Sequence, residues 1–369
     1  MIRIAAIPDT LLTCQLGDVG LLTDHQSLDV TFATATETLL AGKFYATGGT
    51  VTLRDLRSLA EQAIKATGFS IEKFTIRAVY ADEVAEATFT AVYCDRDIDI
   101  YDVDPLFKNH FLSAATSRRI APDAFVFVSF FARKGKRLSY HIFCDYIVVS
   151  GGRSVERKVL RGHTSFLGGL ANFTAVEDNV QTLAVSCAEV RQRVSQHAGV
   201  EVELVSFTVR CDNRGITFFI DKSLTGQRCF YFRNAFNAPD LLYLPTVTTA
   251  KTSNERSLAV LTDRSEFYDN TPKQEFEVQS GALTSGECAL AEQLFDSDDV
   301  RVVYESQPDD ADFDALRPIL ITDFTCEIAD LPEKPNAVKF TWRFATNRTT
   351  FANPAADNIF TEPYNFVFK

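Results

Sequence analysis

The stretch Cys229-Phe-Tyr-Phe-Arg-Asn-Ala-Phe-Asn-Ala-Pro-Asp-Leu-Leu-Tyr-Leu-Pro245 reads as two apolar strands joined by a polar turn. The strands are predicted over residues 229–232 and 241–244, and the residues between them are of types that favour turns. An aromatic hairpin of this kind can join two sheets. It also stands where the character of the sequence changes, so we expect it to join a repeated region to a different module.

The side chains of this hairpin divide into two predicted roles. The apolar residues of its strands are expected to bury the junction, and they are Phe230, Phe232 and Leu242. The polar residues between the strands are expected to set the turn, and they are Asn234, Asn237 and Asp240. This is a role in stability, and no catalytic residue is predicted here.

Composition favours a folded protein that is mainly β. The 369 residues suggest two or three domains, and 46% hydrophobic with 23% charged residues is typical of globular chains. Phe occurs 31 times, and aromatic residues favour strands. The net charge of −12 argues against a general nucleic-acid binder, which needs a basic surface to neutralise phosphates.

One pattern occurs twice before the hairpin. A helix-like run closed by Gly68 precedes the strand Phe74-Thr-Ile-Arg77, and a second helix-like run closed by Gly199 precedes Phe207-Thr-Val-Arg210. Each copy has the order strand, Gly turn, short helix and two-stranded hairpin. This order predicts an internal duplication. The alternative is that two unrelated β-rich modules have converged on similar patterns.

These observations predict several β-sandwich-like modules, each with a short helix. The first module is predicted over 1–110, and the second, repeat-like module over 111–236, with a long insertion loop at 151–180. The third is predicted over 237–369, with a helix at 285–296. Thr284 is expected to cap this last helix, with Glu287 as its capping-box partner.

Motifs for catalysis or cofactor binding are missing from the sequence. The histidines are dispersed without HExxH, and there is no GxSxG, no phosphate-binding GxxxxGK[ST] and no dinucleotide-binding glycine pattern. The cysteines lack the clustered spacing of a zinc site, and we expect them to be reduced residues of the core. They are Cys14, Cys94, Cys144, Cys187, Cys211, Cys229, Cys288 and Cys326. We therefore expect no cofactor and no enzymatic activity.

The acidic run at 95–104 is a weak candidate for a cation site. On a strand, Asp95, Asp97 and Asp99 would share one face. An EF-hand loop is excluded because Ile100 and Leu106 occupy the positions that need Gly and Glu. The open alternatives are an irregular calcium site and a solvated strand face.

The insertion at 151–180 carries a basic cluster in an otherwise acidic chain. Its members are Arg153, Arg157, Lys158 and Arg161. They are candidates for an electrostatic interface with an acidic neighbouring copy. The alternative is a solvated loop.

The chain contains no apolar run long enough to span a bilayer. A secretion signal at the N-terminus is not expected, because Pro8 and Asp9 interrupt the apolar stretch there. We therefore expect synthesis in the cytoplasm and no membrane insertion.

Four stretches carry a resemblance to a known group of proteins. They are Phe232-Arg-Asn-Ala-Phe-Asn-Ala-Pro-Asp-Leu-Leu-Tyr243, the run at 281–297, Asp299-Val-Arg-Val-Val-Tyr304 and Val338-Lys-Phe-Thr-Trp-Arg-Phe-Ala345. Together they resemble tail-associated structural proteins of Bacteroidetes phages and prophages, of distal-tail or baseplate type. The resemblance covers roughly residues 229–346 and includes no catalytic signature.

The resemblance implies a ring-forming homo-oligomer that joins the tail tube to adhesion devices. Its partners would be copies of itself and other tail proteins, and its final location would be the virion. A carbohydrate-binding or adhesion β-sandwich that contacts a host-surface glycan is the alternative. A glycan-active enzyme is a third interpretation. Such an enzyme needs two carboxylates at a defined separation, and the acidic residues of the predicted loop at 309–314 do not specify one.

Overall fold

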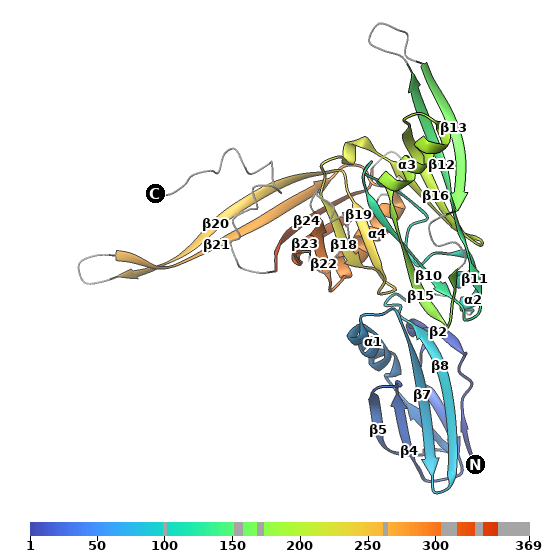
Figure 1. Ribbon diagram of the computed structural model, residues 1–369. Helices are drawn as coiled ribbons and strands as arrows, with labels where there is room; N and C mark the ends of the chain where they lie inside the picture. The colour runs from blue at the N-terminus through green and yellow to red at the C-terminus, as the bar shows by residue number, and fades with distance from the viewer. Residues whose placement is uncertain are drawn as a thin grey trace.

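The computed structural model describes residues 1–98, 102–150, 158–167, 173–260, 265–303, 316–328 and 335–345. Strands far outnumber helices in this part of the chain, which confirms the predicted mainly β class. The strands are arranged in three modules, and Figure 1 shows the first of them extending away from the other two.

Module 1 is a two-layered sandwich with one helix. Its larger sheet has the order β5-β4-β7-β8-β2, in which only the edge pair β8–β2 is parallel. Its smaller sheet has the order β1-β3-β6. The elements are β1 (Ile2–Ile4), β2 (Thr10–Leu12), β3 (Val19–Thr23), β4 (Ser27–Ala33), β5 (Thr38–Tyr45), β6 (Thr50–Leu53), α1 (Leu56–Thr67), β7 (Ile71–Tyr80) and β8 (Glu83–Val92).

Module 2 repeats the order of the larger sheet, but among the described residues its second layer is two-stranded, without a counterpart of β1. Its larger sheet has the order β13-β12-β16-β17-β9, again with a parallel edge pair, β17–β9. The second layer is the antiparallel pair β10–β15. The elements are β9 (Ser117–Ile120), β10 (Phe125–Ala132), β11 (Arg137–Leu138), β12 (Tyr140–Ser150), β13 (Lys158–Leu167), β14 (Phe173–Thr174), β15 (Asn179–Ser186), α3 (Cys187–Ala198), β16 (Glu203–Cys211) and β17 (Arg214–Ile220).

The structure therefore contains the predicted repeat of strand and helix order, whereas duplication as its origin stays a prediction. In both modules the helix precedes the two central strands of the larger sheet, and a short early strand closes the edge in parallel. Each helix ends at a glycine in the left-handed region, Gly68 with φ 71° and Gly199 with φ 69°. Glycine adopts this conformation without steric cost, which explains why both helices stop there.

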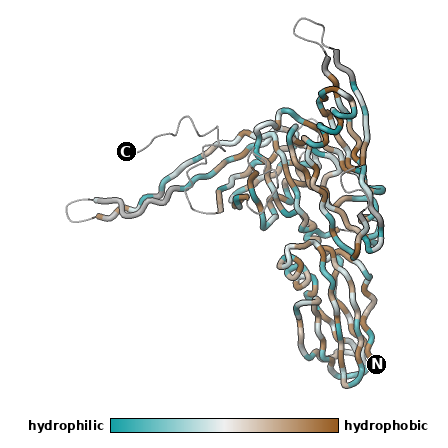
Figure 2. The backbone as a smooth tube through the Cα atoms, viewed as in Figure 1, coloured by the Kyte–Doolittle hydropathy of each residue, from teal (hydrophilic) through white to brown (hydrophobic). Residues whose placement is uncertain are grey.

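Alternation of side chains explains the strands of these sandwiches. Along β7 the residues Phe74, Ile76 and Ala78 are fully buried, while the residues between them are more exposed. A period of two places one set on the core face and the other outside. Figure 2 shows this alternation of apolar and polar residues along the strands of module 1.

Module 3 has a different topology. It contains a sheet of order β19-β18-β22 and another of order β20-β21-β24-β23. The predicted helix is confirmed as α4, and Thr284 and Glu287 form its predicted capping box. The elements are β18 (Cys229–Arg233), β19 (Pro239–Tyr243), β20 (Thr246–Val260), β21 (Ser265–Ser280), α4 (Ser285–Asp296), β22 (Val300–Val303), β23 (Ile319–Glu327) and β24 (Ala337–Phe344).

Two long hairpins project from the packed body (Figure 1). One is β12–β13, and the predicted loop at 151–180 is wrong in part because β13 pairs with β12 over ten residues there. Glycine content suggested a loop, but cross-strand pairing decided the conformation of residues 158–167. The other hairpin is β20–β21, whose length the sequence did not predict because its residues are mostly polar.

A short helix, α2 (Val103–Asn109), was also missed and connects modules 1 and 2. The Asp102 side chain accepts a hydrogen bond from the Asp104 amide at 2.9 Å and so caps its start. Pro105 lies in the first turn, where the missing amide proton costs nothing. Val103 and Phe107 are buried, so tertiary packing stabilises a helix too short to be stable alone.

Candidate functional site

The hairpin β18–β19 lies between two hydrophobic cores, and we call it the junction hairpin. Cys229, Tyr231, Leu241 and Tyr243 belong to the core of module 2. The alternate residues Phe230, Phe232, Leu242 and Leu244 belong to the core of module 3. The predicted boundary at 236/237 falls within this hairpin, whose two faces are shared between the cores. The packing of one face in its core therefore affects the position of the other face in the second core.

The turn of the junction hairpin reaches module 1. Phe236 and Ala238 join a third apolar cluster with Leu12, Val92 and other residues of modules 1 and 2. The Asn237 amide Nδ2 donates to the Phe69 carbonyl at 2.6 Å, and the Asp95 amide donates to the Ala235 carbonyl at 3.1 Å. One hairpin thus contacts all three modules.

Asn234 and Asn237 set the turn as predicted. The Asn234 amide donates to the Ala238 carbonyl at 2.9 Å, and the Asn237 amide donates to the Asn234 carbonyl at 2.8 Å. Asn237 has φ 53°, in the left-handed region that Asn tolerates better than most residues. The prediction for Asp240 is wrong, because this residue lies in β19 and bonds to another module.

Asp240 forms a buried ion pair with Arg118 of β9. The two side chains are each 2% exposed, and Arg118 Nη1 donates to Asp240 Oδ1 at 2.5 Å. Arg118 also donates to the carbonyls of Leu241 and Phe127, at 3.1 and 3.2 Å. The other carboxylate oxygen lies within 3.5 Å of the Asn234 amide group. The pair fixes module 2 to the junction hairpin.

The next residue, Arg119, binds module 3 in the same way. Its Nε and Nη2 donate to the two oxygens of Glu287, at 2.8 and 2.7 Å. Glu287 is 1% exposed and also accepts from the Thr284 amide at 2.9 Å. Successive residues of a strand point to opposite sides, so β9 holds the junction hairpin with one arginine and α4 with the next.

A second buried arginine, Arg214, holds α2 in place. It donates through Nε to the Phe107 carbonyl at 2.7 Å and through Nη2 to the Phe131 carbonyl at 2.9 Å. The Phe107 carbonyl lies in the last turn of α2, where a cation is favourable to the helix dipole. None of the three arginines was predicted, since their partners lie about 80 to 170 residues away.

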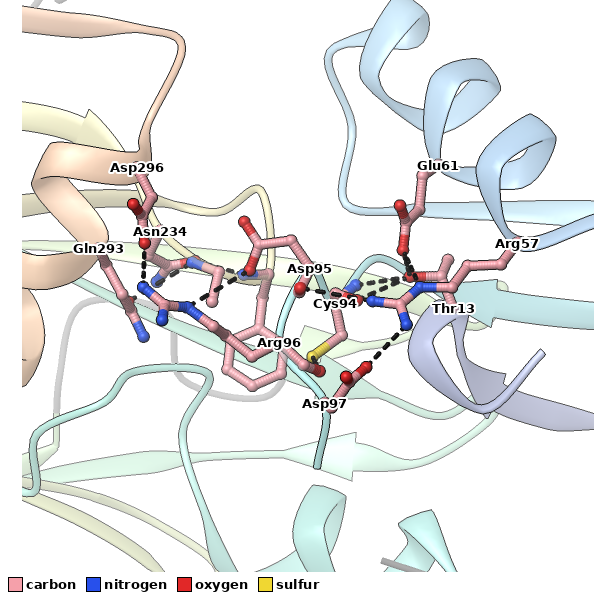
Figure 3. Close-up of polar contacts among 12 residues, drawn as sticks. Thr13, Arg57, Glu61, Cys94, Asp95, Arg96, Asp97, Asn234, Gln293 and Asp296 are labelled. Atoms are coloured by element: carbon pink, nitrogen blue, oxygen red, sulfur yellow. Dashed lines mark hydrogen bonds and ion pairs between the residues drawn. The ribbon is translucent and has the colours of Figure 1, made fainter. Parts of the chain in front are cut away.

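Ion pairs and a cavity lie between module 1 and module 3, and Figure 3 shows the pair formed by Arg96 and Asp296. Lys65 of α1 donates to Asp298 at 2.6 Å, and Arg96 pairs with Asp296 at the end of α4. Lys65 and the two aspartates line a cavity of about 230 Å³, together with Tyr93, Asp95 and Asn234. Burial raises the pKa of Asp95 above its usual value. The lining carboxylates Asp296 and Asp298 are neutralised by cations of the same chain, which suits a contact between modules.

The predicted strand face with three aspartates is wrong. β8 ends at Val92, so Asp95 and Asp97 lie in a non-strand segment, while Asp99 lies outside the described residues. Asp97 instead accepts from Arg57 Nη1 at 2.7 Å (Figure 3). Among the described residues, no group of three His, Cys, Asp or Glu side chains could hold a metal ion.

The basic cluster is only partly described. Arg153 and Arg157 lie outside the described residues, and Lys158 begins β13. Arg161 lies opposite Ile147 on β13 and is exposed. The interface prediction for this cluster stays a prediction. In the described part of the chain, no helix has the length and apolar character needed to cross a membrane.

Replacing Asn237 by alanine is expected to destabilise the protein by about 2 kcal/mol, through lost hydrogen bonding and left-handed strain. Asn237→Gly keeps the backbone relaxed and loses only the bond to Phe69, so its cost should be about 1 kcal/mol or less. Urea denaturation of both variants measures the difference. If Asn237→Ala and Asn237→Gly lowered the free energy of unfolding equally, backbone strain at this position would not contribute.

Stability should also fall in acid through Glu287. Burial opposes ionisation of its carboxyl, but hydrogen bonds from Arg119 and the Thr284 amide outweigh burial and lower the pKa. A lowered folded-state pKa contributes stability above the unfolded value of about 4.3, and this is lost as the pH falls through the folded value. Glu287→Gln should remove this component and cost about 1–3 kcal/mol at neutral pH.

The measurement is urea denaturation of both proteins at neutral pH and at successive acidic values. The expected result is that the difference between wild type and Glu287→Gln shrinks as the pH falls. Glu292→Gln, in the same helix but partly exposed, is the matched control and should follow the wild type. A constant difference at all pH values would contradict the assignment.

No known protein-family model and no curated protein matches this chain. Among solved structures, the chain has a weak similarity to "CBD12 from CALX1.2", at 12% identity and a TM-score of 0.16, over 57% of this chain and 79% of that one. A second is Salmonella alpha-2-macroglobulin reacted with methylamine, at 8% identity and a TM-score of 0.19, over 76% of this chain and 22% of that one. Similarities at this level carry no argument about fold or function.

Proposed function

We propose that the chain is a non-enzymatic structural component of a phage or prophage tail, of distal-tail or baseplate type, that assembles into a homo-oligomer. The sequence resemblance over residues 229–346 supports the tail assignment. The projecting hairpin β20–β21 is the structural observation that carries the assembly part of the proposal.

This hairpin has little support from its own chain. β20 and β21 pair from Thr246↔Ser280 to Val260↔Ser265, but β24 pairs with β21 only from Phe276 to Gln279. The outer part is thus a two-stranded ribbon among the described residues. Isolated two-stranded ribbons are marginally stable in water, so contact with a partner would stabilise it.

The ribbon also presents apolar side chains to solvent. Leu258 is 52% exposed and Val260 is 76% exposed, and Val247 at the base of the hairpin is 74% exposed. The outer edge of β20 pairs with no strand in the described part of the chain, and its 15 residues contain no Pro or Gly. An open edge of this length is suited to strand addition by a neighbouring subunit.

The contacts around the junction hairpin suit a rigid structural part. Three modules are held by shared cores and by the pairs Arg118–Asp240 and Arg119–Glu287. A rigid body with projecting ribbons can keep neighbouring subunits in register.

Size-exclusion chromatography with light scattering tests the proposal. The full chain should form a defined oligomer. A matched variant joins Lys251 to Glu275 through a two-residue Asn-Gly turn and so removes only the ribbon beyond the β24 pairing. This variant should fold but assemble less. A full chain that stays monomeric at the highest attainable concentration would contradict the proposal.

A glycan-binding function is the second candidate, and one surface favours it. On the outer face of the larger sheet of module 2, Phe143 is 42% exposed and Phe219 is 47% exposed. Arg210 lies over the Phe143 ring at 5.2 Å. The same sheet of module 1 presents Thr31, Arg77 and Glu86 on its outer face, so the aromatic surface is specific to module 2.

Glycan-array binding by the wild type, lost in a Phe143→Ala/Phe219→Ala variant that still folds, would favour this second function. Binding by a strict monomer would favour it over the tail assignment. No binding on the array, together with a defined oligomer, would leave the structural role as the better account.

A further inference from the structure

Cys14 and Cys94 are brought together by the parallel edge of module 1. In that register Leu12 of β2 lies opposite Val92 of β8. Both cysteines lie two residues beyond this pair. Thr13 fixes them there, because its hydroxyl donates to the Cys94 carbonyl at 3.0 Å and accepts from the Cys94 amide at 2.9 Å. Cys14 packs against the apolar cluster to which Cys94 belongs.

The two thiols have different surroundings. Cys14 is partly exposed in the short 3-10 helix Thr13–Gln15, whereas Cys94 is fully buried and donates through Sγ to the Arg96 carbonyl at 3.3 Å. Interaction with the neighbouring Cys94 side chain is the largest cause that lowers the pKa of Cys14 to about 7, with smaller contributions from the Ile98 backbone and Arg57 and opposition from burial and Asp97. The same interaction and burial raise the pKa of Cys94.

We propose that Cys14 and Cys94 form a reactive dithiol that a hydroperoxide oxidises to an intramolecular disulfide. The partly exposed Cys14 thiolate attacks one oxygen of the peroxide, the O–O bond breaks, and the other oxygen takes up a proton from solvent and leaves as water or an alcohol. Cys14 is then a sulfenic acid. The Cys94 sulfur loses its proton, attacks the Cys14 sulfur and displaces hydroxide, which leaves as water. With hydrogen peroxide, two thiols and one peroxide give one disulfide and two waters.

Oxidation at this position would affect the junction with module 3. The Cys94 thiol would lose its proton and with it the hydrogen bond to the Arg96 carbonyl. The Arg96 side chain pairs with Asp296 of α4, and the neighbouring Asp95 amide donates to the junction hairpin (Figure 3). The inference does not depend on the proposed tail function.

The chain supplies a matched control pair. Cys288 of α4 is buried in the core of module 3, and Cys326 of β23 is partly exposed and packs against the same core. Burial raises the pKa of Cys288 to about 12 and raises that of Cys326 as well. Two neighbouring pairs of thiols are therefore compared in one protein, and of these four cysteines only Cys14 has a lowered pKa, which favours the reactive thiolate form.

The first measurement is alkylation of the folded full-length protein at neutral pH, followed by peptide mass spectrometry. Cys14 should react about tenfold faster than Cys326, because a higher thiolate fraction outweighs the lower nucleophilicity of a more acidic thiol. Equal rates for the two residues would overturn the proposal.

The second measurement is treatment with stoichiometric hydrogen peroxide. The wild type and Cys288→Ser should lose two thiols per chain and give a linked peptide pair containing residues 14 and 94. Cys14→Ser should lose none, and Cys94→Ser should stop at a sulfenic acid on Cys14 that dimedone traps. If Cys94→Ser fails to fold, thiol loss in Cys14→Ser still tests the proposal, because Cys14 is partly exposed and its replacement is less disruptive. Linkage through other cysteines, or unchanged thiol loss in Cys14→Ser, would overturn the proposal.

Discussion

Asp240→Ala is expected to lower the free energy of unfolding by about 3–5 kcal/mol, because it leaves the guanidinium of Arg118 buried without its counter-ion. Both side chains are 2% exposed, so solvent cannot replace the lost partner. The Leu241 amide, which donates to Asp240 at 2.8 Å, also loses its acceptor. Thermal and urea unfolding of the full-length protein, followed in modules 2 and 3, measure the loss of stability.

Two control variants separate charge from shape at this pair. Asp240→Asn keeps the volume but removes the charge, so it should lose most of the same stability. The double variant Arg118→Met/Asp240→Leu replaces the pair by apolar groups and should be far closer to the wild type than Asp240→Ala. The stability losses of Arg118→Met and Asp240→Leu are also measured singly. If their sum equalled the loss in the double variant, a direct buried pair would be contradicted.

Phe230→Ala is expected to cost about 3–5 kcal/mol through loss of buried area and the cavity that remains. Phe230 is 1% exposed and packs edge-on against Phe340 and Trp342, with ring centroids 5.4 and 6.4 Å away. Because it lies on the face of β18 that belongs to module 3, hydrogen exchange should increase first in α4 and β24. Exchange combined with urea unfolding measures both effects.

Phe230→Leu is the matched control, since it keeps an apolar side chain of smaller volume and should cost markedly less. Tyr231→Ala tests the opposite face, which belongs to the core of module 2, and should increase exchange first in β16 and β17. The shared-hairpin arrangement would be contradicted if both variants loosened the same module.

These expectations describe a rigid junction, and the proposed assembly role depends on that rigidity. The contacts within it are paired carboxylates and guanidiniums, carbonyls and packed rings. The surfaces that the two proposals assign to partners are the projecting β20–β21 ribbon and the outer face of the larger sheet of module 2.

Local patterns were sufficient for much of the fold. Alternation predicted β7 and β8, turn residues predicted the junction hairpin, and the capping box predicted α4. Gly68 and Gly199 marked both helix ends because only a residue without a side chain adopts positive φ there without strain. These features depend on neighbours in sequence, so one sequence is enough to recognise them.

The features that the sequence did not predict depend on pairing between residues far apart in the chain. Asp240 was assigned to a turn because Asp favours turns, yet its partner Arg118 lies 122 residues away. β13 was taken for a loop, because its glycine-rich surroundings conceal a strand that only pairing with β12 stabilises. Asp97 was placed on a strand face, but the strand ends earlier and the side chain binds Arg57.

By itself, then, the sequence determined the mainly β class, both helix-bearing repeats and the position of the junction hairpin. Only the tertiary structure decided that each face of the hairpin belongs to a different core, and that Arg118 and Arg119 bind different elements from one strand. It also brought Cys14 beside Cys94. The physical reason is that register between distant strands, which periodicity along the chain does not encode, decides which side chains meet.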